Sequence, residues 1–135
     1  MSRLLALDYG EKRVGVAVSD PLGLTAQPKP YIENNHAIIN SIKQLIGTMN
    51  ITKIFIGLPK DTRGGESKKS IEVREFKDIL ESELQLEIQF IDERFSTVAA
   101  TKQLDLMGIN RKKQRQLIDS QAAAFMLQGI LDKNN

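Results

Sequence analysis

Residues 4–19 have the sequence LLALDYGEKRVGVAVS. The apolar run Leu4–Leu7 is typical of a buried strand, and Arg13–Ser19 predicts a second one. Because the turn between them is short, the two strands are expected to pair in antiparallel fashion. Asp8 closes the first strand. A carboxylate at the tip of a central strand must be hydrogen-bonded, ion-paired or bound to a cation, since burying it bare costs several kcal/mol. Asp8 is therefore the first candidate metal ligand.

The rest of the chain alternates extended and helical patterns. Hydrophobic spacing, caps and turn residues predict these elements: an extended segment over 24–32, a helix capped by Asn34 or Asn35 that carries apolar residues 38–49, a strand over 53–59, a helix over 67–83, a strand over 86–91, a helix from Ser96 or Thr97 to near Gly108, and a last helix from Asn110 to about Leu131.

This order predicts an α/β fold. Helix crossovers make the later strands parallel, which gives a mixed five-stranded sheet with helices on both faces. Pro28 and Pro30 place the third strand at an edge of the sheet. The buried side of the 67–83 helix is expected to carry four residues, Val73, Phe76, Ile79 and Leu80. Ligands of such sheets bind at the carboxyl ends of the parallel strands, where Asp8, Pro59 and Asp92-Glu93 are expected.

Length and composition fit an ordinary globular protein. The chain has 135 residues, so residues 1–135 are expected to form a single domain. It contains no cysteine, which excludes disulfides, thiolate metal sites and a thiolate nucleophile. No signal peptide and no apolar run of about 20 residues is apparent, so we expect a cytoplasmic protein without a membrane span.

Two further acidic positions are candidate ligands. Asp92-Glu93-Arg94 directly follows the fifth predicted strand, and strand alternation should turn one of the two carboxylates toward the ligand. Asp119 heads a small, apolar helical stripe that continues through Ala122, Ala123, Met126 and Ile130. It lies about nine residues past Asn110, too far for a helix cap. A surface ion pair with Arg94 is the competing interpretation for the first group.

Carboxylates that converge from three elements repel one another. At about 5 Å and an effective dielectric of about 20, each pair costs roughly 3 kcal/mol, which a divalent cation would remove. Oxygen ligands select a hard ion, so Mg²⁺ or Mn²⁺ is expected. His36, the only histidine, is expected to be exposed. Carboxylate-held hard ions beside basic residues suit phosphodiester hydrolysis.

The basic residues are clustered although the net charge is only +2. Localised positive charge suits a phosphate-binding face. The candidate substrate contacts are Lys12, Arg13, Arg63, Arg94 and Lys112. Gly10, in the first turn, is expected to adopt a positive φ. The low aromatic content, 5%, favours recognition of backbone and shape over base stacking.

Four segments together resemble the YqgF family, also called RuvX, whose members are Holliday-junction-resolvase-like proteins. The matching stretches are LALDYGEKRVGVAVSD at 5–20, IGLP at 56–59, DERFST at 92–97, and DSQAAA at 119–124 followed by Leu127-Gln128. The resemblance implies a ribonuclease-H-like fold and a metal-dependent nuclease site. Carried over by position, the family's acidic residues fall on Asp8, Glu93 and Asp119. The family is linked to maturation of the 5′ end of pre-16S ribosomal RNA.

The leading hypothesis is a Mg²⁺- or Mn²⁺-dependent endonuclease acting on structured nucleic acid, with pre-ribosomal RNA as substrate. One alternative keeps the chemistry and acts on branched DNA as a Holliday-junction resolvase, which would need two sites and hence a dimer. Another is a non-catalytic RNA-binding ribosome assembly factor. An actin-like ATPase ranks low, because such chains carry two domains of this kind. We expect a monomer or a weak homodimer.

Overall fold

The computed structural model describes residues 2–59, 67–92, 108 and 111–134, with the backbone alone at 92, 111–119 and 134. Its elements are the strands β1 (Arg3–Asp8), β2 (Arg13–Ser19), β3 (Ala26–Glu33), β4 (Ile51–Leu58) and β5 (Glu87–Asp92), and the helices α1 (Ile38–Met49), α2 (Lys68–Glu83) and α4 (Arg111–Asn134). These bounds agree within about two residues with the predicted ones, except that the last helix ends three residues further along the chain. The helix predicted between Ser96 or Thr97 and Gly108 lies outside the described residues.

The five strands form one sheet in the order β3-β2-β1-β4-β5. β1 pairs antiparallel with β2 and parallel with β4, and β4 pairs parallel with β5. The predicted mixed sheet is therefore confirmed, with the short turn and the helix crossovers acting as expected. The last residues of β1, β4 and β5 are Asp8, Leu58 and Asp92. They lie at what we call the carboxyl end of the sheet.

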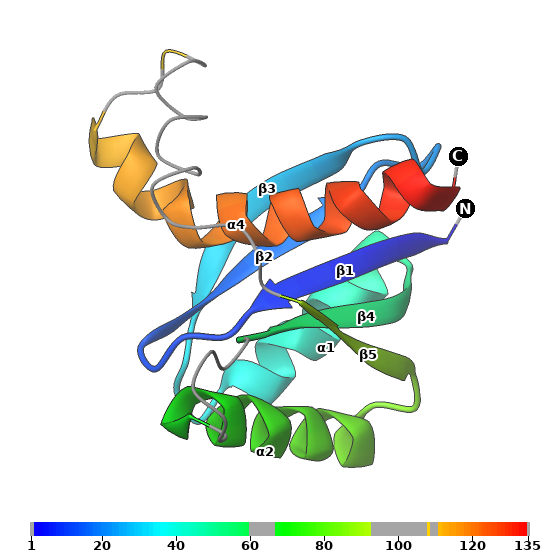
Figure 1. Cartoon of the computed structure of the whole chain (residues 1–135). Helices are drawn as coiled ribbons and strands as arrows, with labels where there is room; N and C mark the ends of the chain where they lie inside the picture. Colours follow the sequence, from blue (N-terminus) through cyan, green and yellow to red (C-terminus); the bar gives the residue numbers. More distant parts are fainter. Residues whose placement is uncertain (1, 60–66, 93–107, 109–110, 135) are drawn as a thin grey trace.

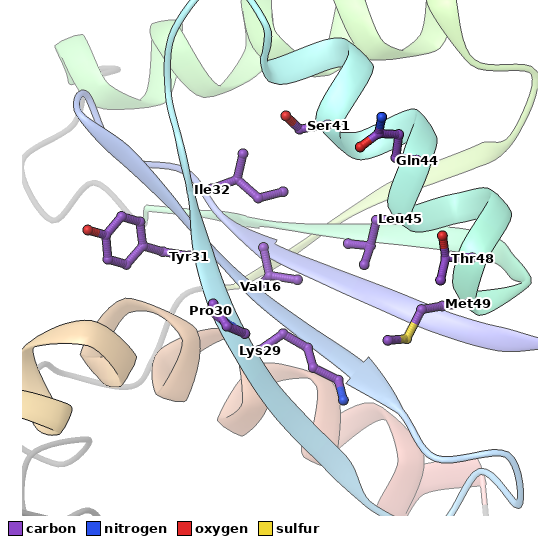
Figure 2. Close-up of a pocket in the computed structure, with 10 residues that line it drawn as sticks. All are labelled: Val16, Lys29, Pro30, Tyr31, Ile32, Ser41, Gln44, Leu45, Thr48 and Met49. Carbon is purple, nitrogen blue, oxygen red and sulfur yellow. The ribbon is translucent and has the colours of Figure 1, made fainter.

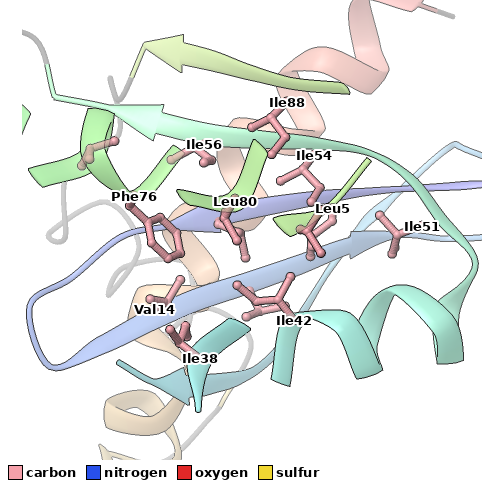
Figure 3. Close-up of a cluster of buried hydrophobic side chains, with 14 of the residues drawn as sticks. Leu5, Val14, Ile38, Ile42, Ile51, Ile54, Ile56, Phe76, Leu80 and Ile88 are labelled. Atoms are coloured by element: carbon pink, nitrogen blue, oxygen red, sulfur yellow. The ribbon is translucent and has the colours of Figure 1, made fainter. Parts of the chain in front are cut away.

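Helices cover both faces of the sheet, as predicted. Figure 1 shows α4 crossing one face while α1 and α2 lie on the other. The core under α1 and α2 contains large aliphatic residues such as Leu5, Ile54 and Leu80 (Figure 3). The core under α4 combines large residues such as Phe55 and Leu127 with alanines on both the sheet and the helix, including Ala6 and Ala123. Small side chains let α4 approach the sheet closely, which matters for the site described below.

One predicted core residue of α2 is exposed. Val73, Phe76 and Leu80 are buried as expected, but Ile79 is 52% exposed. At about 100° per residue, Val73, Phe76 and Leu80 lie within about 60° of one another around the axis, whereas Ile79 lies about 60° beyond Phe76, at the margin of the stripe. Ser70 takes the remaining buried position and its hydroxyl donates to the carbonyl oxygen of Pro59, at 3.3 Å.

The edge strand β3 exposes little hydrogen-bonding capacity where it could pair with another chain. Pro28 and Pro30 have no N–H, and the N–H of Ala26 donates to Oε1 of Gln128 on α4, at 2.9 Å. Since strand N–H groups alternate in direction, these three positions face the same side. The prolines therefore suit an edge position, as the sequence indicates, and they discourage strand addition.

The turn between β2 and β3 is held by Asp20. Its Oδ1 accepts from the N–H of Leu24 at 2.7 Å and of Thr25 at 3.0 Å. The hydrogen bond from Thr25, with smaller contributions from Leu24 and Gly23, lowers the pKa of the Asp20 carboxyl below its ordinary value. Gly23 has a φ of +72°, which glycine adopts without strain.

Among the described residues, no helix combines the length and the apolar character needed to cross a bilayer.

Candidate functional site

Asp8 presents its side chain to the α4 face of the sheet. Along β1, Leu5 and Leu7 belong to the core under α1 and α2, whereas Leu4 and Ala6 pack in the core under α4. Strand side chains alternate, so Asp8 follows Ala6 onto the α4 face. Its Oδ1 is buried from solvent. The predicted position of this carboxylate, at the end of a central strand, is confirmed.

A buried hydrogen bond fixes α4 beside this strand end. Val16 of β2 pairs with Leu7 of β1, and Gly15 pairs with Asp8. The N–H of Val16 donates to Oγ of Ser120 on α4, at 3.0 Å, in fully buried surroundings. Ser120 therefore places this turn of α4 over the part of β2 that lies next to Asp8.

The Ser120 contact arises from an irregularity of the sheet. Between β2 and β3 the register shifts: Val14 pairs with Ile32, but Val16 pairs with Lys29. Two residues of β3 thus oppose Gly15, as in a β-bulge, and a bulge disrupts the local ladder. The hydroxyl of Ser120 gives the Val16 N–H a partner that the disrupted ladder does not supply. A buried N–H without a partner would cost about 1–3 kcal/mol.

The structure describes the other two candidate acidic residues, Asp119 and Glu93, to different extents. Asp119 lies on α4 directly before Ser120, so its backbone is close to the Asp8 end of β1; its side chain is outside what is described. Glu93 directly follows β5 and lies outside the described residues. On β5, Ile88 and Phe90 pack on the α1 and α2 side, whereas Ile91 packs under α4. Convergence of the three carboxylates stays a prediction.

The structure likewise describes only some of the candidate basic residues. Lys12 and Arg13 are exposed on the turn that follows Asp8, at the carboxyl end of the sheet. The guanidinium carbon of Arg13 lies 5.4 Å from the ring centre of Tyr31 on β3, in cation–π range. Arg63 and Arg94 are outside the described residues. Lys112 lies in the first turn of α4, where the structure describes the backbone alone.

The turn that follows Asp8 is tightly closed. The prediction of a positive φ at Gly10 is wrong, because positive φ is found at Gly23 and Gly108 among the described glycines. Glycine is required at position 10 for space: a Cβ there would overlap the carbonyl oxygen of Arg13. Asn34 closes the turn from outside. Its Nδ2 donates to the carbonyl oxygen of Gly10 at 2.8 Å, and its N–H donates to that of Lys12 at 2.9 Å.

The donor chemistry at Asp8 fits a hard divalent ion. A buried carboxylate oxygen at a strand end is a ligand that Mg²⁺ and Mn²⁺ accept. His36 is exposed, as expected, and is no competing ligand there. Within the described part of the chain no group of three or more acidic or histidine side chains could hold a metal. The other predicted ligands, Glu93 and the side chain of Asp119, lie outside what the structure describes.

A large hollow lies away from this site. It has a volume of about 430 Å³ and opens between β3 and α1 (Figure 2). Val16 and Leu45 contribute to its apolar floor, and Ser41, Gln44 and Thr48 to its polar side. It lies on the α1 side of the sheet, whereas Asp8 faces α4. Asp8 does not line it.

Two residues shape the site without being predicted to do so. Ser120 belongs to the motif at 119–124, and a serine on an otherwise apolar helical stripe is the signal for its hydrogen-bond partner. Asn34 was predicted as a possible helix cap. The predicted cap by Asn34 or Asn35 is wrong: the N-cap residue of α1 is Ala37, without a side-chain cap bond. Oδ1 of Asn35 accepts from the N–H of Ala37 at 2.9 Å just before the helix, and Asn34 binds the turn after Asp8.

Comparisons with known proteins agree with this architecture. The chain is 42% identical over 135 residues to "Putative pre-16S rRNA nuclease" of Sulfurihydrogenibium sp. (strain YO3AOP1), covering 98% of this chain and 92% of that protein. It is 43% identical to the protein of the same name from Clostridium tetani (strain Massachusetts / E88), with 96% of each chain covered.

Solved structures share the fold at low sequence identity. T. thermophilus RuvC in complex with a Holliday junction substrate matches with a TM-score of 0.62 at 10% identity, covering 99% of this chain and 96% of that one. The fowlpox virus resolvase in complex with Holliday junction DNA matches with a TM-score of 0.57 at 11% identity, covering 98% of each chain. The sheet is thus of the ribonuclease-H-like type. A family model described as "RuvX: Holliday junction resolvase" matches residues 2–133, and the chain belongs to this family.

Proposed function

We propose that this protein is a metal-dependent endonuclease that hydrolyses phosphodiester bonds of structured nucleic acid, processing the 5′ end of pre-16S ribosomal RNA. The observation that carries the proposal is the position of Asp8. Its carboxylate ends a central strand on the face covered by α4, next to the helical turn that Ser120 fixes. The names of the relatives at 42–43% identity support the RNA substrate.

Asp8, Glu93 and Asp119 would together hold Mg²⁺ or Mn²⁺. The alternation along β5 favours Glu93 for the α4 side, because Ile91 packs there and side chains two positions apart share a face. Ser120 holds Asp119 near the strand end through its bond to Val16. A divalent ion held there would lower the pKa of an attacking water and stabilise the leaving oxygen.

The basic residues would hold the substrate. Lys12 and Arg13 leave the turn that follows Asp8 and are exposed, so they can bind phosphates that flank the cleaved bond. The tight turn at Gly10 and its hydrogen bond to Asn34 restrict the backbone from which the side chains of Lys12 and Arg13 extend. Arg63, Arg94 and Lys112 are further proposed phosphate contacts. The protein would act in the cytoplasm as a monomer or weak homodimer.

A second substrate, four-way DNA, is favoured by one observation: the matching family model is described as a Holliday junction resolvase. The chemistry would be the same. Symmetric cleavage of a junction would require two sites and hence a stable dimer. The two substrates therefore predict different oligomeric states as well as different products.

The test compares purified wild type with Asp8→Asn and with Asp78→Asn, an exposed carboxylate on α2. Each protein is incubated with labelled pre-16S leader RNA and with a synthetic four-way DNA junction, in Mg²⁺, Mn²⁺ or chelator. We expect metal-dependent cleavage by wild type and Asp78→Asn, and none by Asp8→Asn, while RNA binding survives in all three. If wild type binds RNA but cleaves neither substrate with either metal, the protein is a non-catalytic binding factor.

A further inference from the structure

A hollow of about 350 Å³ lies at the carboxyl end of the sheet, on the α2 side of the turn that follows Asp8. It lies between that turn and the start of α2, and its lining consists of Tyr9, Gly10, Glu11, Lys68, Lys69 and Glu72. A volume of this order is in the range of small-ligand sites. Three of its lining residues directly follow Asp8 in the chain, so a ligand bound there would lie at the same carboxyl end of the sheet as Asp8, on the face opposite to α4.

The wall formed by the turn is fixed before any ligand binds. The ring of Tyr9 packs against that of Phe76, with ring centres 4.8 Å apart. Asn34 donates to the carbonyl oxygens of Gly10 and Lys12, and so fixes the turn from the other side. A wall that does not reorganise loses little entropy when a ligand binds.

The wall formed by α2 is fixed as well. Oγ of Ser67 accepts from the N–H of Ser70 at 3.1 Å and caps the helix. Ser70 is buried and bonds to the carbonyl oxygen of Pro59. The charged side chains that α2 contributes to the hollow are those of Lys68 and Lys69, neighbours in its first turn, and that of Glu72 one turn further on.

The two lysines that line the hollow are poorly neutralised by ion pairs. Nζ of Lys68 lies 3.9 Å from Oε1 of Glu72, and the Lys68 side chain is 88% exposed, so this ion pair is weak. Lys69 is exposed, and the described part of the chain offers it no ion-pair partner. The first turn of α2 carries no acidic residue. Two neighbouring cations at a helix start repel each other and the helix dipole, and an anion in the hollow would relieve both effects.

We propose that this hollow binds a backbone phosphate of nucleic acid that lies across the carboxyl end of the sheet, with Lys68 and Lys69 as its ligands. The identity of the ligand rests on the proposed function. Glu11, on the opposite wall, is exposed and negative, so it opposes a phosphate. The proposal therefore predicts opposite effects for the two walls: removal of the lysines weakens nucleic-acid binding, and removal of the Glu11 charge strengthens it.

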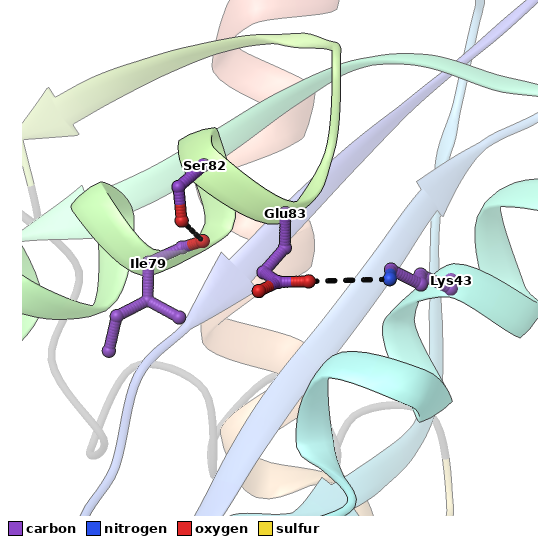
Figure 4. Close-up of polar contacts among 4 residues, drawn as sticks. All are labelled: Lys43, Ile79, Ser82 and Glu83. Carbon is purple, nitrogen blue, oxygen red and sulfur yellow. Dashed lines mark hydrogen bonds and ion pairs between the residues drawn. The ribbon is translucent and has the colours of Figure 1, made fainter.

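The experiment measures binding of a structured RNA hairpin and of a four-way DNA junction, in chelator, as a function of salt concentration. The variants are Lys68→Ala/Lys69→Ala and Glu11→Gln. The matched control, Lys43→Ala/Lys133→Ala, removes the same charge elsewhere. Lys43 pairs with Glu83 at 3.5 Å (Figure 4), and Glu83 lies about 22 Å along α2 from Lys68.

We expect the lysine pair to reduce affinity on the order of tenfold near 0.1 M salt and to lower the salt slope by about 1–2. Glu11→Gln should bind more tightly than wild type, and the control should match wild type. The subsite is refuted if the lysine variant binds like the control, or if Glu11→Gln binds more weakly. Binding is measured without metal and so does not depend on cleavage. If the lysine variant binds more weakly while the wild type never cleaves, the nuclease proposal is refuted and the subsite is not.

Discussion

Ser120→Ala removes the hydroxyl that docks α4 on β2. The bond joins residues 104 positions apart, and both ends are buried: Ser120 is 0% exposed and Val16 is 1% exposed. The substitution leaves the N–H of Val16 without a partner inside the protein. The methyl group of alanine is nearly as large as the serine side chain, so the loss is one of hydrogen bonding rather than of packing.

The expected loss of stability is about 1–2 kcal/mol. An unsatisfied buried N–H costs about 1–3 kcal/mol, and the better helix propensity of alanine returns roughly 0.5 kcal/mol. Unfolding entropy of about 2.1 cal/mol/K per residue gives about 0.28 kcal/mol/K for 135 residues. The melting temperature should therefore fall by about 4–7 °C.

Urea unfolding followed by circular dichroism, in chelator, measures this loss. The control is Ser82→Ala, whose hydroxyl donates to the carbonyl oxygen of Ile79 in an exposed turn of α2 (Figure 4). It should change stability by less than about 0.5 kcal/mol. If Ser120→Ala unfolds at the same urea concentration as Ser82→Ala, the bond to Val16 does not anchor α4 and the argument for the position of Asp119 loses its support.

Three further predictions concern the turns and the site. Gly10→Ala should destabilise by about 1–3 kcal/mol because its Cβ would overlap backbone, whereas Gly47→Ala, in an open helical position, should stabilise by about 0.5–1 kcal/mol; thermal melts of both variants check the opposite signs. The pKa of Asp20 is lowered, chiefly by the N–H of Thr25, so its charge stabilises the fold above about pH 4 and this contribution disappears as the carboxyl protonates at lower pH; urea midpoints of wild type and Asp20→Asn should differ at pH 7 and converge below pH 4. Asp8→Asn should raise the melting temperature in chelator by relieving repulsion among carboxylates, and a lower value would contradict their convergence.

The strands and their relative directions were predictable from local patterns. The run from Leu4 to Leu7 marks β1, the short turn fixes its antiparallel partner, and helices between later strands fix the parallel pairs. Pro28 and Pro30 marked the edge strand because each removes an N–H. These signals lie in the residues themselves or in the length of a connection.

The contacts that shape the site were not predictable, because they depend on geometry between distant segments. The hydrogen bond from Val16 to Ser120 depends on the change of register between β2 and β3. No local sequence pattern predicts a bulge at that position. Asn34 resembled a helix cap from its place before a helix, yet it bonds to the turn after Asp8, 24 residues away. Ile79 fits a helical hydrophobic pattern, but the sheet offers it no surface to pack on.

The central claim is that the carboxylates of residues 8, 93 and 119 bind one hard metal site. Anomalous diffraction from crystals grown with Mn²⁺ tests it most directly. The account predicts a manganese peak with carboxylate oxygens of Asp8, Glu93 and Asp119 at about 2.0–2.3 Å. A manganese ion bound elsewhere, or coordinates that put any of the three carboxylates on the far side of the molecule, would contradict it.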